Sequence, residues 1–162
     1  MEKTPVNFQQ SLGKILSIII YASLAFAVLG ILLKTQNQSS GDIILMVSLS
    51  ALAGALFLSA FMPVNIPEGL KPDLYSMIMY KVIYIGSSVN VIGILFTLLH
   101  LNGAPNMLLV GSLTAGAASI FSGVLFLKNG DNWVVLKQAF ITGVAVVSAG
   151  VYFIMKSGLA FN

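Results

Sequence analysis

The sequence contains no cysteine and no arginine, and each absence excludes a class of function. Without cysteine the chain has no disulfide, no thiolate nucleophile and no cysteine-ligated metal cluster. All eight basic residues are lysines, so the arginine forks and dense basic patches typical of phosphate recognition are missing. We therefore expect no nucleic-acid partner, no metal site and no cofactor.

Charge of either sign is also scarce, since 8% of the residues are charged and 57% are hydrophobic. A soluble domain has about 25% charged residues, so this chain cannot keep a water-facing surface and its solvent is the lipid bilayer. All five acidic residues lie in loops or at their edges. Ion-coupled transport normally needs a carboxylate within the membrane, so a self-sufficient pump or coupled transporter is not expected.

What the sequence does contain is a series of long apolar runs, at 15–33, 43–62, 81–99, 107–127 and 134–155. A helix of about 20 such residues crosses the roughly 30 Å hydrocarbon core. We predict an all-α, polytopic bundle of five transmembrane helices, in a single integral membrane domain over 1–162. Pro63, Pro67 and Pro72 mark the longest connection, which we expect to run to about Met79.

The first two runs resemble the next two when the chain is shifted by 63 residues without a gap. Tyr21 then meets Tyr84, Gly30 meets Gly93, and Leu45 meets Leu108. This pattern predicts a parallel internal repeat, with a first helical hairpin at 15–62, a second at 81–127 and a closing helix at 134–155.

Lysine positions predict the orientation of the five spans. One side would hold six lysines, at 3, 14, 71, 81, 128 and 137, and the other side only Lys34 and Lys156. Because cytoplasmic loops are enriched in basic residues, we expect the N-terminus in the cytoplasm and the C-terminus outside.

Four polar residues within or beside the spans are candidates for function, namely His100, Lys34, Asn90 and Thr97, and the first three each allow two interpretations. His100, the only histidine, is either a pH-sensing or proton-shuttling group or a cap at the end of the third helix. Lys34 is either a ligand sharing an outer-face site with His100 or a lysine that extends to the headgroups. Asn90 is either a polar ligand or an interhelical hydrogen-bonding group. We favour the structural interpretation of each.

Small residues repeat at a spacing of four in the fourth run, as Gly111-x-x-x-Ala115 and Ser119-x-x-x-Gly123. This spacing places small side chains on one helix face and lets two backbones approach closely. The face would serve either self-association or a partner subunit, or else packing within the chain. Because small residues occur on more than one face, we expect this helix at the centre of the bundle.

Residues 93–114 read GILFTLLHLNGAPNMLLVGSLT. The segment resembles the membrane domain of gliding-motility protein L, from the type 9 secretion motor of Bacteroidetes. The shared positions are His100, Gly103, Ala104, Met107, Leu108, Gly111 and Thr114. Thr97 replaces the family's lysine, and Ala115 replaces its intramembrane glutamate, so ion-driven motor function does not carry over. The resemblance implies a hairpin of the bacterial inner membrane without the coupling group.

These observations favour a non-catalytic inner-membrane protein that acts as a subunit or accessory of a larger assembly. The alternative is a channel or carrier for a small solute, ion or lipid, with a site between the two hairpins. That site would be lined by Ser87, Ser88, Asn90, Thr97 and Thr114. A third possibility is a membrane enzyme using His100, but no nucleophile–base pair, phosphate-binding loop or paired carboxylate accompanies it. We therefore do not expect an enzyme.

Overall fold

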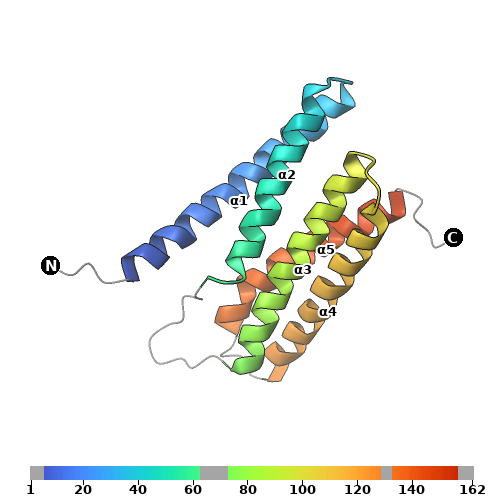
Figure 1. The fold of residues 1–162 in the computed structure, drawn as a ribbon. Coiled ribbons are helices and arrows are strands. Elements are labelled where there is room, and N and C mark those ends of the chain that lie inside the picture. Colours follow the sequence, from blue (N-terminus) through green and yellow to red (C-terminus); the bar gives the residue numbers. More distant parts are fainter. Residues whose placement is uncertain (1–5, 63–72, 129–132, 157–162) are drawn as a thin grey trace.

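The computed structural model describes residues 6–62, 73–128 and 133–156. The described chain forms five helices and no strand, namely α1 (Val6–Thr35), α2 (Ser40–Ser59), α3 (Leu74–Leu98), α4 (Ala104–Lys128) and α5 (Trp133–Lys156) (Figure 1). All five helices are long and apolar enough to cross a membrane. The prediction of an all-α polytopic membrane bundle is confirmed.

Two helices begin earlier than the apolar runs predict. α1 begins at Val6 and not at Ile15, and α3 begins at Leu74, seven residues before Lys81. The expectation that the long connection reaches Met79 is therefore wrong. The apolar runs show where a helix enters the hydrocarbon core, whereas the helical backbone hydrogen bonds continue into the neighbouring polar sequence wherever proline does not interrupt them. Asp73, which has an extended backbone, is the N-cap residue of α3.

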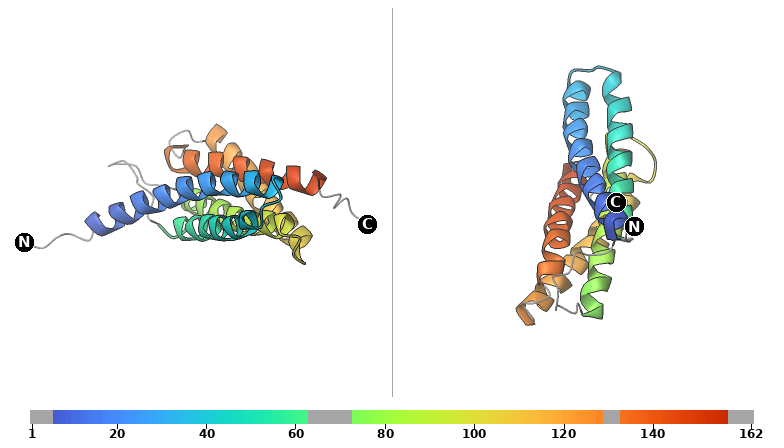
Figure 2. Two further views of the ribbon diagram at one scale, coloured as in Figure 1. Left: turned by 90° about the horizontal axis from the view of Figure 1, so that it is seen from above. Right: turned by 90° about the vertical axis from the view of Figure 1, so that its left-hand side faces the viewer.

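α3 is the central helix of the bundle. It packs against α2, α4 and α5, whereas α1 packs substantially against α2 alone (Figures 1 and 2). In the membrane-crossing stretch of α3, 56% of the residues are buried, compared with 33% in α4. The expectation that the fourth helix is central is wrong, because its small residues allow close contact on one side and leave another side uncovered.

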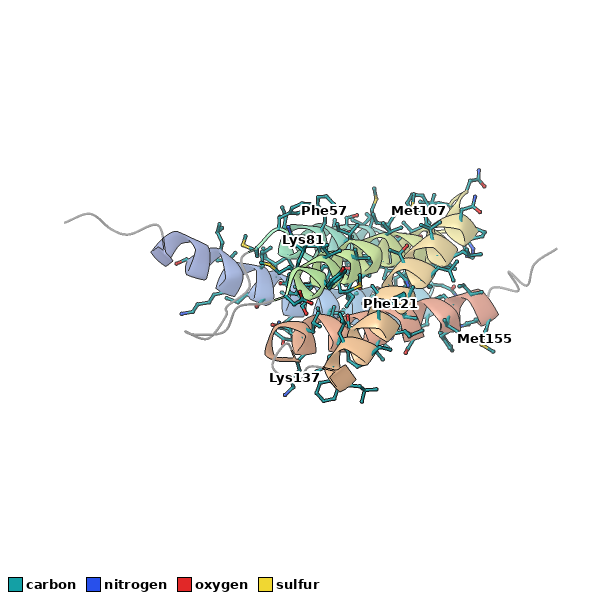
Figure 3. All side chains as sticks on the ribbon, turned by 90° about the horizontal axis from the view of Figure 1, so that it is seen from below. Phe57, Lys81, Met107, Phe121, Lys137 and Met155 are labelled. Carbon is teal, nitrogen blue, oxygen red and sulfur yellow. The ribbon has the colours of Figure 1, made fainter. Side chains whose placement is uncertain are left out.

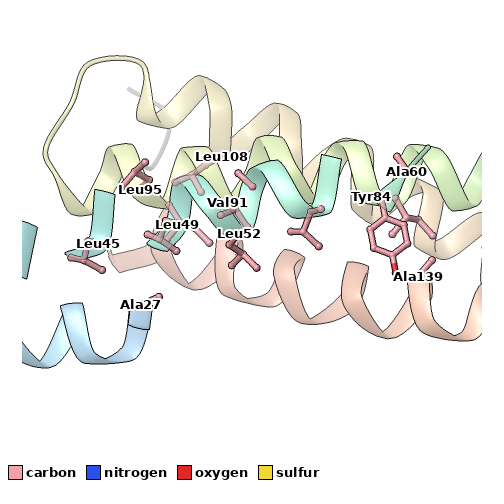
Figure 4. Close-up of a cluster of buried hydrophobic side chains, with 14 of the residues drawn as sticks. Ala27, Leu45, Leu49, Leu52, Ala60, Tyr84, Val91, Leu95, Leu108 and Ala139 are labelled. Atoms are coloured by element: carbon pink, nitrogen blue, oxygen red, sulfur yellow. The ribbon is translucent and has the colours of Figure 1, made fainter. Parts of the chain in front are cut away.

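The first hairpin joins the rest of the bundle through the contact between α2 and α3. Leucines spaced by three and four residues along α2 form one packed cluster with Val91 and Leu95 of α3 (Figure 4): Leu45, Leu49, Leu52 and Leu56. Ser88 Oγ of α3 donates a hydrogen bond to the Ala53 carbonyl of α2 over 2.8 Å. Since lipid supplies no hydrophobic drive between helices, such packing and interhelical bonds stabilise the contact.

α1 and α3 end in the same way. Asn37 and His100, the two non-glycine residues with positive φ among those described, follow the C-caps of the two helices with φ of 58° and 55°. In each case the next residue donates its N–H to the carbonyl five residues earlier, from Gln38 to Leu33 and from Leu101 to Phe96. These are Schellman motifs, which satisfy the last carbonyls of a helix and start a tight turn. We call the end of the bundle that carries these turns the turn end.

Other features of the two hairpins share the 63-residue spacing that separates Asn37 from His100. Gly30 lies so close to Leu45 across the first hairpin that a Cβ atom added to this glycine would overlap the leucine. In the second hairpin, a Cβ atom added to Gly93 would likewise overlap Leu108. The hydroxyls of Ser59 and Ser122 each donate to the carbonyl four residues earlier, both over 2.8 Å. The two hairpins are thus closed by equivalent contacts.

Large apolar side chains cover much of the outside of the bundle. Examples on three different helices are Phe57, Phe121 and Met155, whose exposed fractions are 45%, 62% and 78% (Figure 3). Such a surface is stable only in a non-aqueous solvent, which agrees with a lipid environment.

Candidate functional site: a buried polar centre among three helices

Asn90 lies at the centre of a polar cluster within α3, α4 and α5. Its side chain is fully buried, and its Nδ2 donates a hydrogen bond to Ser112 Oγ of α4 over 2.8 Å. Its Oδ1 has no hydrogen-bond partner among the described residues, and neither has Oγ of Ser87, one turn earlier and also fully buried. The structure thus assigns Asn90 an interhelical hydrogen bond and leaves one side of its amide open to a further donor.

Two glycines allow the helices to approach this amide. A Cβ at Gly111 of α4 would overlap the backbone N and Cα of Asn90. A Cβ at Gly150 of α5 would lie 2.5 Å from Asn90 Oδ1 and 2.6 Å from Ser112 Oγ. Because a glycine has a hydrogen in this direction, the Cα–H of Gly150 faces the amide and supplies a weak hydrogen-bond contact.

A second layer repeats this arrangement seven residues away on each helix. A Cβ at Gly143 of α5 would lie 2.6 Å from Ser119 Oγ of α4 and 2.8 Å from the Cγ2 methyl of Ile83 in α3. The seven-residue spacing on all three helices is the period of left-handed helix packing. The polar centre therefore fixes the register of α3, α4 and α5.

The chemistry available at this centre is limited to neutral hydrogen bonding. Its groups are one amide and several hydroxyls, and no cluster of three His, Cys, Asp or Glu residues that could hold a metal ion occurs in the described part of the chain. Buried polar groups without partners are costly in a membrane. This arrangement suits helix association or contact with a small polar group, and it offers no nucleophile or general base.

The turn end carries a separate cluster around Lys34. Its Nζ donates to Asp42 Oδ1 over 2.7 Å and to the Leu98 carbonyl over 2.5 Å, so that it connects α1, α2 and α3. Lys34 therefore has two partners within the chain, whereas its interpretation as a lysine extended to the headgroups stays a prediction. The short turn after α1 brings Asp42 within reach, and the carbonyl end of α3 is the negative end of its helix dipole. His100 lies two residues after Leu98, is exposed, and occupies the left-handed position of the Schellman motif.

Replacement of Lys34 by methionine should lower the stability of the bundle more than replacement of Asp42 by asparagine. Lys34→Met removes both bonds, whereas Asp42→Asn keeps the bond to Leu98. The lysine and aspartate side chains are 31% and 54% exposed, so we expect a loss of about 1 kcal/mol for Lys34→Met and about half of that for Asp42→Asn. Thermal unfolding in mild detergent measures both. Equal losses would mean that the bond to α3 contributes nothing.

The polar residues expected to line a cavity between the hairpins do not converge. Asn90 lies against α4 and α5, whereas Ser88 bonds to α2 and Thr97 bonds to the Gly93 carbonyl of its own helix. Most of the buried polar side chains lie in α3 and α4, whereas Ser23, Ser48 and Ser59 are buried in the first hairpin. Thr97 therefore takes no part in the centre around Asn90.

The small residues predicted for helix packing divide between two neighbours. Gly111 and Ala115 pack against α3, where a Cβ at Gly86 would lie 2.7 Å from the backbone N of Ala115. Ser119 and Gly123 line a groove between α4 and α5. Gly143 and Gly150 were not predicted as site residues, although their spacing of seven matches that of Gly86 and Gly93 and was visible in the sequence.

Comparison with known proteins identifies no relative of this chain. No protein-family model, no curated protein and no solved structure matches it. The resemblance of residues 93–114 to gliding-motility protein L stays a prediction. The helices and contacts described above therefore carry the functional argument, and what they establish is a multi-pass membrane bundle.

Proposed function

We propose that the protein is a non-catalytic subunit or accessory of a larger assembly in a bacterial inner membrane, with α1 as its partner-binding helix. The proposal includes the parallel repeat, in which the two hairpins are copies of one unit. It also includes the orientation expected from the lysines, with the N-terminus in the cytoplasm. The buried centre around Asn90 contains only neutral hydrogen-bonding groups, which supports a role other than catalysis.

The observation that carries the proposal is a difference between equivalent helices. When the chain is shifted by 63 residues, Leu24 of α1 corresponds to Ser87 of α3, and Ile31 of α1 corresponds to Ile94 of α3. The α3 residues are 0% and 7% exposed, whereas Leu24 and Ile31 are 45% and 39% exposed. α5 packs against α3, but none of the described helices covers the corresponding face of α1. The first hairpin thus has a free helix face where the second hairpin has a bound helix.

The composition of this face favours a protein partner. The exposed face of α1 includes Tyr21, which is 71% exposed and lies six residues after Ile15, the first residue of the uncharged run. At about 1.5 Å per residue, the phenol ring lies ~9 Å into that run. Tyrosine combines a large apolar surface with a hydrogen-bonding group and is enriched in protein interfaces.

Crosslinking from α1 tests the proposal, and the absence of cysteine makes the labelling site unique. A benzophenone attached to Val28→Cys, which is 57% exposed on α1, should give one crosslinked product of defined mass in native membranes. The matched control is Phe121→Cys on α4, which is 62% exposed and should give none. Particles extracted in mild detergent should be larger than a single chain. A monodisperse monomer without any α1 product would reject the subunit role.

The carrier alternative rests on the open side of the Asn90 amide. It requires α3, α4 and α5 to separate, because the groups around Asn90 are fully buried. Solute flux into liposomes containing the purified protein, lost in Asn90→Leu, would support it. Flux that is absent, or that survives this substitution, leaves the subunit role as the better account.

A further inference from the structure

A groove between α4 and α5 remains open on the outside of the bundle. It has a volume of about 380 Å³ and is lined by residues on one face of each helix: Gly116, Ser119, Ile120 and Gly123 of α4, and Phe140, Val144, Val147 and Ser148 of α5. Two of the α4 residues are glycines, whose missing side chains make room for the groove. A Cβ at Gly116 would have Val147 as its nearest neighbour at 3.8 Å, and one at Gly123 would have Phe140 at 3.9 Å.

One end of this groove has a positive charge. Phe140 marks the end nearest the start of α5, and Lys137 precedes it by one helical turn. Lys137 is exposed, and its spacing of seven from Val144 places it on the same face of α5 as the groove. A lysine near the end of a spanning helix extends toward lipid phosphates while its methylene chain stays in apolar surroundings.

The two serines on the lining add little polarity to the groove. Ser119 is 5% exposed, and its Oγ is buried beside Gly143 and does not reach the open surface of the groove. The hydroxyl of Ser148 donates to the Val144 carbonyl. A ligand in the groove would therefore meet apolar walls.

We propose that this groove binds one acyl chain of an anionic phospholipid, with the phosphate at Lys137. The apolar walls take the hydrocarbon chain, and the lysine supplies the charge complement of the headgroup. The site lies on α4 and α5, away from the α1 face, so it does not depend on the proposed partner.

Native mass spectrometry of protein extracted from vesicles of equal phosphatidylcholine and phosphatidylglycerol tests this site. Wild-type protein should keep one phosphatidylglycerol. The double variant Gly116→Leu/Gly123→Leu, whose side chains fill the groove, should retain lipid only at background level. Gly54→Leu is the matched control, because a Cβ at this exposed glycine of α2 meets nothing within 4 Å. It should retain lipid like the wild type.

The variant Lys137→Gln tests the contact with the headgroup separately. Because Lys137 is exposed on the surface, this substitution does not disturb helix packing. It should reduce the preference for phosphatidylglycerol about fivefold, whereas Lys81→Gln on α3 should leave the preference unchanged. Lipid retention in the groove-filled variant equal to wild type, or an unchanged preference in Lys137→Gln, would overturn the proposal. So would disulfide-linked dimers of Ile120→Cys, because they would mean that a helix of a second copy occupies the groove.

Discussion

Gly150→Ala should destabilise the bundle, and Asn90→Ala should restore much of the loss. The added methyl group would lie 2.5 Å from Asn90 Oδ1 and 2.6 Å from both Asn90 Nδ2 and Ser112 Oγ, so the amide must move. We expect a loss of about 2 kcal/mol for Gly150→Ala, the usual cost of overpacking. Asn90→Ala alone removes one interhelical hydrogen bond, which is worth about 1 kcal/mol in a membrane protein.

The double variant is the informative measurement. Asn90→Ala removes two of the three atoms that the new methyl group meets, and it frees Ser112 Oγ from its bond to Asn90 so that this hydroxyl can turn away. The loss in the double variant should therefore be smaller than the sum by at least about 1 kcal/mol. Thermal or denaturant unfolding of the four proteins in the same detergent gives this coupling energy. Strict additivity would mean that α5 does not approach Asn90 as closely as described.

Gly111→Ala should be more damaging, with a loss of about 3 kcal/mol or failure to fold. A Cβ here would overlap the backbone of Asn90, so α3 and α4 would have to move apart along their length. Truncation of the Asn90 side chain leaves that backbone in place. Asn90→Ala should therefore not rescue Gly111→Ala, in contrast to Gly150→Ala.

Gly54→Ala is the matched control for a glycine-to-alanine change within a spanning helix. Its Cβ would meet nothing within 4 Å, so only the greater helix propensity of alanine remains. We expect no loss, or a gain of up to about 1 kcal/mol. If Gly111→Ala proved as well tolerated as Gly54→Ala, the close contact between α3 and α4 would be wrong.

The number of helices and their membrane character could be predicted from the sequence because length and hydropathy decide them. Helix ends were less predictable, as the early starts of α1 and α3 illustrate, because polar residues also continue a helix. The central position of α3 could not be predicted from residue size. Gly111 and Ala115 did indicate close packing, but a small residue does not identify the helix it meets.

The candidate site was predictable in part. A mid-span asparagine such as Asn90 is costly in lipid, so the sequence alone marked it for attention. Its neighbours were not predictable, since Gly111, Ser112 and Gly150 come from two other helices and meet Asn90 only after packing. The Leu98 carbonyl that Lys34 binds could not be predicted for the same reason, because it is 64 residues away in the chain.

The attachment of the first hairpin mainly through α2 has a consequence for how the chain is made. Ribosomes deliver α1 and α2 before α3 has been synthesised, and α3 provides both the surface against which α2 packs and the Leu98 carbonyl that Lys34 binds. During that interval the early pair is held together by its own contacts, such as that of Gly30 with Leu45 and the ion pair of Lys34 with Asp42. The helices that enter the membrane first are thus among the last to find their neighbours.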